Sequence, residues 1–545
     1  MSRLLPLALL LLAVGTLAAC DSGIGGSANG NRAPETELSV RVTDLRVTLD
    51  GTTLPSTVAV AWVGTDPDGV VAAYDFRYYD ASRLGTIGPE EGWVTTTRRD
   101  TSIVLPIPEG SATAAVVFEV RAVDDDGSKD ATPARTVFPI RNSAPSLRLL
   151  AAEAPPDSTW PVISFGWAAT DPDGEANLAS IELALNDTTG GFARLPGDID
   201  FVTLVALEPG ATESETRLLL GRNGIPSDLR LPGLRIGAAN TLYIRAVDAA
   251  GARSVTRSYP EDETGTFFVR RVTSPVLLVN DYRTERHGIV MAYHRPIVRE
   301  YLGGVSPDEW FLSTPYQTGA NTELRYAANF PPQSTPTLRE TFKLWRAIYW
   351  VSSNATNRAQ GNNLPLAASV IDPFFDAGGR MFVNVAARPP ASSADNIGNA
   401  ALSLLPLSGL LSFGPGNAYP DFEPLLDLFI NAPIAPVDAL PTGQPLPALR
   451  ARRFIAGTFS YPVESGTLSL YRASYTATRS STGNTEPWTG PSTIASMRGD
   501  GRVALFALPL VSDINGQALL EGADGNAAAP RQAIKLILEA LGFPR

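Results

Sequence analysis

The hydrophobic and polar positions divide the chain into three stretches with different patterns. Leu4 to Val14 is an almost unbroken apolar run behind a single positive charge at Arg3. From 34 to 274, short β-branched and aromatic segments alternate with Gly, Pro and Asp turns, which is typical of half-buried strands. From 275 onward, longer apolar runs alternate with stretches of helical period. The pattern predicts an export segment, then β-structure, then strands alternating with helices.

The N-terminal run has the length and the flanks of an export signal. A helix needs ~20 apolar residues to cross a bilayer, and this run is shorter. The tetrapeptide Leu17-Ala18-Ala19-Cys20 resembles the lipobox of bacterial lipoproteins. The resemblance implies that residues 1–19 are removed and that Cys20 carries a diacylglycerol and an acylated amine, which hold the chain on a lipid bilayer. The alternative is an ordinary secretory signal with an incidental cysteine.

Residues 20–33 predict a lipid-bearing flexible tether, because they are rich in Gly, Ser and Asn. Asp21 directly follows the lipidated position. In enterobacterial lipoproteins an Asp at this place resembles the signal for retention in the inner membrane, whereas other phyla sort differently. We expect a place in the cell envelope, with the outer membrane favoured over the periplasmic face of the inner membrane.

Composition narrows the classes of function. The chain of 545 residues is 44% hydrophobic and 18% charged, which is typical of globular domains, and its length predicts about three of them. Cys20 is the only cysteine, so the folded part has no disulfide, no Cys-ligated zinc and no Cys nucleophile. The formal charge is −12, and −13 after Arg3 leaves with the signal. This acidity argues against nucleic acid as a partner, because phosphate binding needs a basic face.

Three markers recur in the same order and predict a duplicated domain. They are a Trp before an Asp-Pro-Asp-Gly turn, an Arg-Ala-Val-Asp strand and a Thr-x-Phe strand. In the first copy they are Trp62 with 66–69, then 121–124 and 136–138, and in the second Trp167 with 171–174, then 245–248 and 266–268. The offset between copies grows from 105 to 130 residues, which predicts extra loop in the second copy between Asp187 and Gly237.

These repeats resemble bacterial fibronectin type III or Ig-like domains, through the Trp, the turn after it and the penultimate Arg-Ala-Val-Asp strand. The resemblance implies two all-β sandwiches, over 34–143 and 144–274. In such a sandwich one Trp packs between the two sheets. We therefore expect Trp62 and Trp167 in the cores, not on the surface as sugar-stacking platforms.

The Asp-rich turns are expected to gather at one end of each sandwich. Clustered carboxylates suit Ca²⁺, which takes six to eight oxygen ligands. Asp also favours turns by bonding to its own backbone, and this plainer explanation is preferred. The calcium candidates are Asp66, Asp68, Asp124 and Asp126 in the first copy and Asp171, Asp173 and Asp248 in the second. No other cofactor is expected.

Residues 275–545 predict an α/β domain with a mostly parallel sheet, since buried strands alternate with helices. The strands are expected at Pro275–Asp281, Leu344–Val351, Arg380–Val385 and Gly501–Leu508, and the helices at Ile289–Tyr301, Leu364–Ala377 and Arg531–Leu541. The predicted fold class is thus two Ig/fibronectin-like sandwiches followed by an α/β mostly parallel-sheet domain.

The order of these elements, with the helix-to-strand junction Asp376–Val383, resembles the class I glutamine amidotransferase-like, or flavodoxin-like, fold. In active members of that family a Cys follows the strand that matches Met381–Val385, with a His and a Glu downstream. Here the turn from Asn384 to Arg388 has no Cys, and no His follows His294. The resemblance therefore implies a catalytically degenerate domain.

A ligand is expected at the carboxyl ends of the strands, as in other open α/β sheets. The candidates are Asn280, Asp281, Tyr282, Ser352, Asn354 and Asn384, although polar residues there are also ordinary loop starters. His287 and His294, the only histidines, are seven residues apart and lie on one helical face. With Asp281 and Glu285 they are a metal candidate, but surface or capping roles are favoured.

The sequence contains no Gly-x-Ser-x-Gly elbow, phosphate loop or zinc-helix motif. We therefore expect a membrane-anchored envelope lipoprotein with a non-catalytic binding, adhesion or assembly role, and an envelope protein or glycan as its partner. The alternative is an envelope hydrolase that acts on polysaccharide or peptide through an unrecognised site in the C-terminal domain.

Overall fold

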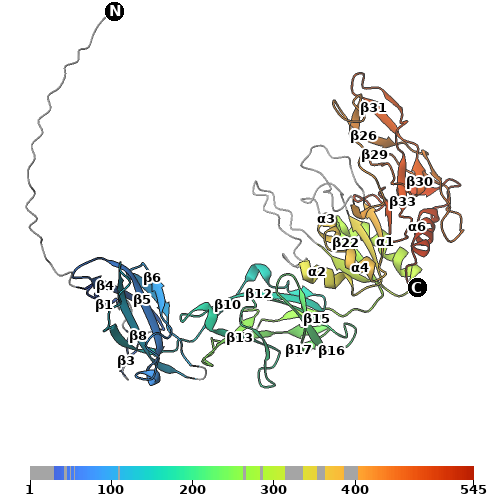
Figure 1. Cartoon of the computed structure of the whole chain (residues 1–545). Helices are drawn as coiled ribbons and strands as arrows, with labels where there is room; N and C mark the ends of the chain where they lie inside the picture. Colours follow the sequence, from blue (N-terminus) through green and yellow to red (C-terminus); the bar gives the residue numbers. More distant parts are fainter. Residues whose placement is uncertain are drawn as a thin grey trace, which may run out of the picture. The chain divides into compact units, whose positions relative to one another are not determined.

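The computed structural model describes most of the folded chain (Figure 1). The described residues are 30–41, 46–48, 51–53, 56–108, 111–261, 265–282, 286–312, 335–352, 363–385 and 403–545. The predicted signal peptide, Cys20, most of the tether, Glu285 and Asn354 lie outside them. The chain divides into two compact units, Met1–Asn142 and Ser143–Arg545. None of the helices in the described ranges combines the length and the apolar character needed to cross a membrane.

The first unit is a sandwich of two antiparallel sheets, of the fibronectin type III or Ig-like kind. One sheet contains β1 (Glu35–Arg41), β4 (Thr57–Thr65) and β7 (Asp100–Val104). The other has the order β6 (Val94–Thr96), β5 (Val71–Asp80), β8 (Thr113–Asp124) and β9 (Ala134–Arg141). A short hairpin adds β2 (Arg46–Thr48) and β3 (Gly51–Thr53).

The core of this sandwich forms around Trp62, which is 3% exposed. Its ring centroid lies within 5.9 to 6.1 Å of those of Tyr74, Phe76 and Phe118, which belong to the facing sheet. Its Nε1 donates to the Arg98 carbonyl at 3.1 Å, so the polar edge of the indole is satisfied. The predicted core role of Trp62 is confirmed.

The second sandwich has the same two-sheet plan with additional strands. Its larger sheet has the order β10 (Ser146–Leu149), β12 (Val162–Thr170), β15 (Phe201–Ala206), β16 (Glu213–Leu220) and β17 (Ile225–Arg235). The facing sheet has the order β14 (Ala193–Pro196), β13 (Leu178–Leu185), β19 (Leu242–Asp248) and β20 (Arg257–Tyr259). A third contains β11 (Ser158–Thr159), β21 (Phe267–Val269) and β18 (Ala238–Asn240).

Equivalent contacts in the two sandwiches confirm the duplication. Trp167, 1% exposed, donates its Nε1 to the Ile199 carbonyl at 3.0 Å, as Trp62 does to Arg98. Arg245 pairs across two strands with Glu182, as Arg121 pairs with Asp75.

The second copy does carry extra residues between Asp187 and Gly237, but the prediction that they form a loop is wrong. The added residues form the hairpin of β16 and β17, which extends the larger sheet by two strands. Their apolar side chains complete the core, where Leu218, Leu231 and Leu234 are buried.

The C-terminal part is built on one mixed sheet of ten strands. Its order is β23 (Asp308–Phe311), β22 (Val276–Asp281), β24 (Ala347–Ser352), β25 (Arg380–Val385), β34 (Val503–Phe506), β33 (Thr493–Met497), β30 (Leu468–Ala473), β27 (Pro433–Pro436), β28 (Leu449–Ala451) and β35 (Leu520–Gly522). A separate four-stranded sheet contains β29 (Ile455–Thr458), β26 (Phe422–Leu428), β31 (Thr476–Arg479) and β32 (Thr485–Pro487).

The prediction of a mostly parallel sheet holds for only half of these strands. The pairs from β23 to β34 are parallel, whereas every pair from β34 to β35 is antiparallel. The short turn between Met497 and Val503 forces β33 and β34 to run in opposite directions, because a parallel pair needs a crossover of a dozen or more residues. The chain as a whole is mostly β-sheet.

Helices cover both faces of the parallel half. α1 (His287–Tyr301) and α6 (Ala529–Ala540) pack with Leu278 and Tyr349 on one face. α2 (Thr335–Phe342), α3 (Leu364–Ala368) and α4 (Asp372–Asp376) pack with Leu277 and Trp350 on the other. In chain order the five parallel strands are arranged 2-1-3-4-5, an order found in flavodoxin-like sheets.

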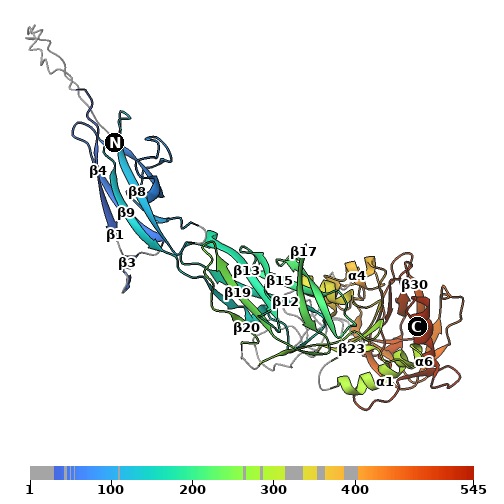
Figure 2. The same ribbon diagram turned by 90° about the horizontal axis from the view of Figure 1, so that it is seen from below.

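The second sandwich and the mixed sheet belong to one compact unit (Figure 2). Trp160 of the sandwich meets Trp345 edge to face, with ring centroids 4.7 Å apart. Arg217 forms an ion pair of 2.8 Å with Glu340 of α2, and Ser164 is hydrogen-bonded to Thr337 of the same helix. These contacts fix the sandwich against α2 and against the segment that leads into β24.

His294 is buried, not at the surface or a helix cap as predicted. It is 1% exposed, and its Nδ1 is hydrogen-bonded to the Tyr349 hydroxyl at 2.9 Å. Burial, with a smaller contribution from the charge of Arg531, lowers the pKa of His294 to about 3. The folded protein therefore holds this imidazole neutral.

We predict that replacing His294 by Gln weakens the acid sensitivity of the C-terminal unit. The pKa of His294 is lower in the folded state than its ordinary 6.5, so its neutral form adds stability above pH 6.5 that is lost as the pH falls toward 3. His294→Gln should lower the free energy of unfolding at pH 7.5, and this deficit should shrink or reverse at pH 4.5. Urea unfolding at both pH values measures it; a deficit that is equal at both would contradict the assignment.

Candidate functional site

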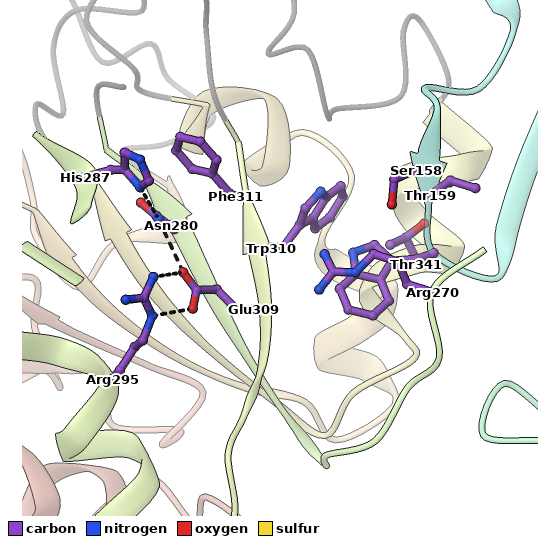
Figure 3. Close-up of a pocket in the computed structure, with 11 residues that line it drawn as sticks. Ser158, Thr159, Arg270, Asn280, His287, Arg295, Glu309, Trp310, Phe311 and Thr341 are labelled. Carbon is purple, nitrogen blue, oxygen red and sulfur yellow. Dashed lines mark hydrogen bonds and ion pairs between the residues drawn. The ribbon is translucent and has the colours of Figure 1, made fainter. Parts of the chain in front are cut away.

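A cavity of about 400 Å³ lies where the second sandwich meets the edge of the mixed sheet (Figure 3). The sandwich contributes Ser158, Thr159, Trp160 and Arg270. The sheet and its helices contribute Asn280, His287, Arg295, Glu309, Trp310, Phe311 and Thr341. This volume falls in the lower part of the range of ligand pockets, about 300–1,000 Å³.

On the sheet side, polar groups at the carboxyl end of β22 form a connected network. Glu309 on the edge strand β23 accepts two hydrogen bonds from Arg295 of α1, at 2.6 and 2.8 Å. Asn280 Nδ2 approaches Glu309 Oε1 at 3.4 Å and His287 Nδ1 at 3.1 Å. Figure 3 shows these side chains together on one side of the pocket. Glu309 is therefore fully engaged.

The network fixes the hydrogen-bonding role of the His287 Nδ1 atom and the orientation of the Asn280 amide. The Glu309 carboxylate can only accept, so it selects the Asn280 amide nitrogen, and His287 Nδ1 must then accept as well. Burial, followed by the charge of Arg295, lowers the pKa of His287, which agrees with a neutral ring. Asn280, 1% exposed, is left with an Oδ1 that has no hydrogen-bond partner.

On the sandwich side, Arg270 lies flat over Trp160, with its guanidinium carbon 4.0 Å from the ring centroid. The Arg270 side chain makes no hydrogen bond or ion pair with any residue that the structure describes. Trp160 is 3% exposed, and its Nε1 has no partner. Burial lowers the pKa of Arg270, while the charges of Asp308 and Glu309 raise it. Two kinds of donor therefore stand unused on this side.

The nearby carboxylate of Asp308 is not available to Arg270. It accepts hydrogen bonds from the backbone nitrogens of Thr273 and Ser274, from Thr273 Oγ1 and from Trp345 Nε1 at 2.6 to 3.2 Å. Asp308 does not line the cavity. The cavity wall thus carries two guanidinium groups and one carboxylate.

Of the ligand candidates at the strand ends, only Asn280 lines this cavity. Asn384 Nδ2 donates to the carbonyls of Phe506 and Leu508, so it joins β25 to β34. The Tyr282 hydroxyl donates to Asp513 at 3.3 Å. Ser352 is buried beside Asp281, its register partner on the neighbouring strand. Asn354 lies outside the described residues.

Asp281 is completely buried at the carboxyl end of β22. It accepts hydrogen bonds from Asn363, through the backbone nitrogen at 2.7 Å and Nδ2 at 2.6 Å, and from Trp350 Nε1 at 3.2 Å. Burial raises the pKa of Asp281 well above its ordinary value, against these hydrogen bonds. The side chain anchors the segment that enters α3, which is a structural role.

Sequence reasoning missed Arg270, Trp160 and Glu309. The only signal for Arg270 was its position at the end of the last sandwich strand, which is common for a charged residue. Trp160 and Glu309 stand far apart in the chain, and the cavity arises only when two folded parts pack together. The two histidines that were the less favoured metal candidate do not converge: His287 faces the cavity, and His294 faces Tyr349.

The acidic turns of the sandwiches show the predicted turn chemistry. Asp66 Oδ1 accepts from the backbone nitrogen of Asp68, and Asp124 Oδ1 from those of Asp126 and Ser128. In the second copy, equivalent bonds join Asp171 to Asp173 and Asp248 to Ala252. Across the described ranges, no group of three or more His, Cys, Asp or Glu side chains is arranged to hold a metal ion. Calcium binding at these turns stays a prediction.

Comparisons with known proteins add little to this description. No protein-family model matches the chain, and no curated protein does. Among solved structures it is similar to fibronectin(III)-like modules of Clostridium thermocellum CbhA, with 12% identity over 43% of this chain and 95% of that one, and a TM-score of 0.16.

Two further solved structures are similar over parts of the chain. The PKD1 domain of Vibrio anguillarum Epp matches with 16% identity over 20% of this chain and 98% of that one, and a TM-score of 0.13. Bacteroides ovatus SGBP-B of the mixed-linkage glucan utilization locus, in complex with a mixed-linkage heptasaccharide, matches with 12% identity over 46% of this chain and 50% of that one, and a TM-score of 0.12. All these TM-scores are below 0.5, so the sandwich type rests on strand order.

Asp171 provides a test of the second sandwich turn. It is 7% exposed, its Oδ2 has no partner, and burial with the nearby charges of Asp173 and Asp248 raises its pKa to about 6. Because the pKa is raised, ionised Asp171 lowers stability above pH 6, and this cost disappears as the pH falls toward 3.8. With chelator present, Asp171→Asn should raise the free energy of unfolding at pH 7.5 by on the order of 2 kcal/mol. The melting temperature should rise accordingly by a few degrees.

The same substitution at Asp187 is the control with opposite sign. Hydrogen bonds from Thr189 lower the pKa of Asp187, so its ionised form stabilises the fold and Asp187→Asn should reduce the melting temperature at pH 7.5. A scan of both variants at pH 7.5 and pH 4.5 separates them. If Asp171→Asn lowered the melting temperature at pH 7.5, a stabilising interaction of the ionised carboxylate within the protein would replace our explanation.

Proposed function

We propose that this chain is a cell-envelope lipoprotein that binds a glycan without transforming it, in the cavity between the second sandwich and the mixed sheet. The observation that carries the proposal is a cavity of about 400 Å³ whose buried wall leaves polar atoms of Trp160 and Asn280 without partners. An unpaired buried polar group costs about 1–3 kcal/mol, so a ligand that supplies the missing bonds is favoured.

The lining suits a sugar better than a purely apolar ligand. A sugar ring has faces of C–H groups and a rim of hydroxyls, each of which both donates and accepts hydrogen bonds. The cavity is lined by the aromatic side chains of Trp310 and Phe311 and by Asn280 and Trp160, whose amide oxygen and indole nitrogen are buried without a partner. Apolar contact combined with a few placed polar groups is the usual design of small-ligand sites.

The anchor supports an envelope location for this activity. Lipidation at Cys20, as the Leu17–Cys20 tetrapeptide implies, would hold the chain at a membrane by two or more acyl chains. In the sequence, the first sandwich lies between that anchor and the residues that line the cavity. It serves as a spacer between the lipidated residue and the unit that carries the site.

Replacing Cys20 tests the lipid anchor. Cys20→Ser should abolish incorporation of a clickable palmitate analogue and leave residues 1–19 on the protein, because the modification that precedes cleavage needs the thiol. Mass spectrometry of the N-terminal peptide and in-gel fluorescence measure both. Ser22→Ala is the matched control and should be labelled like the wild type. Labelling of the Cys20→Ser protein would refute the anchor.

Blocking the cavity tests the binding site. Ser158 is exposed and lines the mouth, so Ser158→Trp should fill the opening without disturbing the core. In ligand-observed NMR against a panel of neutral and acidic mono- and disaccharides, the wild type should bind at least one sugar and return it unhydrolysed. Ser158→Trp should lose that binding.

Thr170→Trp is the matched control for the blocked cavity. Thr170 is also exposed, on the same sandwich, at the far end of β12, which begins two residues after Trp160. This variant should keep the binding of the wild type. Binding of no sugar in the panel, or equal binding by Ser158→Trp, would contradict the proposal.

A further inference from the structure

We infer that the sugar this cavity takes is acidic: a ring bearing a carboxylate, of the uronic acid class, whose carboxylate pairs with Arg270. The inference rests on the proposed glycan binding and names the ligand class of that same site.

The first step is a guanidinium without a hydrogen-bonded acid. Arg270 is half-buried against the Trp160 ring and makes no hydrogen bond or ion pair with any described residue. A buried charge is normally paired, and a guanidinium presents a planar fork of donors that matches a carboxylate. The two acids whose charges act on Arg270 do not supply that partner, because Glu309 is held by Arg295 and Asp308 by the four groups described above.

The second step is a further donor beside Arg270. The Nε1 of Trp160, with no partner in the protein, belongs to the same indole that the guanidinium covers. An indole nitrogen only donates, so it needs an acceptor oxygen from the ligand. Arg270 and Trp160 therefore add two groups that only donate to a wall whose other polar side chains, Ser158 and Thr159, are hydroxyls. A carboxylate, with two acceptor oxygens, fits it better than a hydroxyl, which must also place its own hydrogen.

The third step is the opposite wall, where an unpartnered acceptor would be satisfied by a hydroxyl donor. Asn280 Oδ1 is a buried acceptor without a partner, and it requires a donor from the ligand. Figure 3 places Asn280 on one side of the pocket and Arg270 on the other, with Trp310 between them. A simple anion such as acetate satisfies only the Arg270 wall. A ring that carries both a carboxylate and hydroxyls satisfies both walls.

The experiment compares D-glucuronate and D-galacturonate with D-glucose and acetate by isothermal titration calorimetry on the whole mature protein. We expect an acidic sugar to bind about tenfold or more tightly than glucose and than acetate, since a charge-assisted pair is stronger than a neutral hydrogen bond. Arg270→Gln should remove that preference and leave residual binding at the level of glucose. Arg270→Lys should retain part of it, because the charge stays and the planar fork is lost.

Arg271→Gln is the matched control. Arg271 is the next residue, does not line the cavity, and contacts the Ile236 carbonyl. This variant should bind acidic sugars like the wild type. Trp160→Phe, which keeps an aromatic ring and removes the indole donor, should weaken acidic-sugar binding by a smaller factor. Melting temperatures of all four variants establish that each is folded.

The outcomes separate this inference from the proposed function. Equal binding of glucose and glucuronate, unchanged in Arg270→Gln, would overturn the acidic ligand while glycan binding stands. Equal binding of acetate and glucuronate would overturn the requirement for a ring. If neither uronate binds, the inference fails, and the sugar panel with Ser158→Trp decides the proposed function separately.

Discussion

The carboxylate of Asp308 determines how the second sandwich meets the mixed sheet. It stands at the start of the edge strand β23 and accepts hydrogen bonds from the linker residues Thr273 and Ser274 and from Trp345. The buried donors of Ser274 and Trp345 would be unpaired in the interior without it, at a cost of about 1–3 kcal/mol each. One buried acid therefore joins the end of the sandwich, the edge of the sheet and the segment before β24.

The candidate site follows from that arrangement. Because Asp308 is occupied by the linker, the neighbouring Arg270 is left over Trp160 without an acid of its own. Because Glu309 is paired with Arg295, the sheet side forms no ion pair with Arg270 either. A soluble protein rarely leaves a half-buried guanidinium and a buried indole nitrogen unpaired at the same place unless a ligand completes them. The pocket is thus a consequence of how two folded parts share their polar groups.

The sequence predicted what repeats locally and missed what depends on packing between parts. Trp62 and Trp167 were predictable as core residues, because each stands in a strand of alternating pattern before the same turn. The buried strands β22, β24 and β25 were predictable from continuous apolar runs, and so was Asn280 at a strand end. The antiparallel half of the sheet was not, because short strands such as β27 and β28 carry too few residues to show a period.

Asp281 and Arg270 illustrate the same limit at the site. Asp281 stands where a ligand-binding residue would stand, yet Asn363 and Trp350 satisfy it within the protein. Arg270 stands at an ordinary strand end, yet it contacts the Trp160 ring and forms no ion pair with any of the described residues. The polarity of a residue and its position in a strand can be read from the sequence. Its hydrogen-bond and ion-pair partners depend on how the folded parts pack together.

The most direct test of this account is a crystal structure of the mature protein with D-glucuronate or D-galacturonate at saturating concentration. The account predicts the sugar in the cavity, its carboxylate within hydrogen-bond distance of the Arg270 guanidinium and a hydroxyl donating to Asn280 Oδ1. A sugar bound on the outer face of a sandwich, or a carboxylate turned away from Arg270, would contradict it.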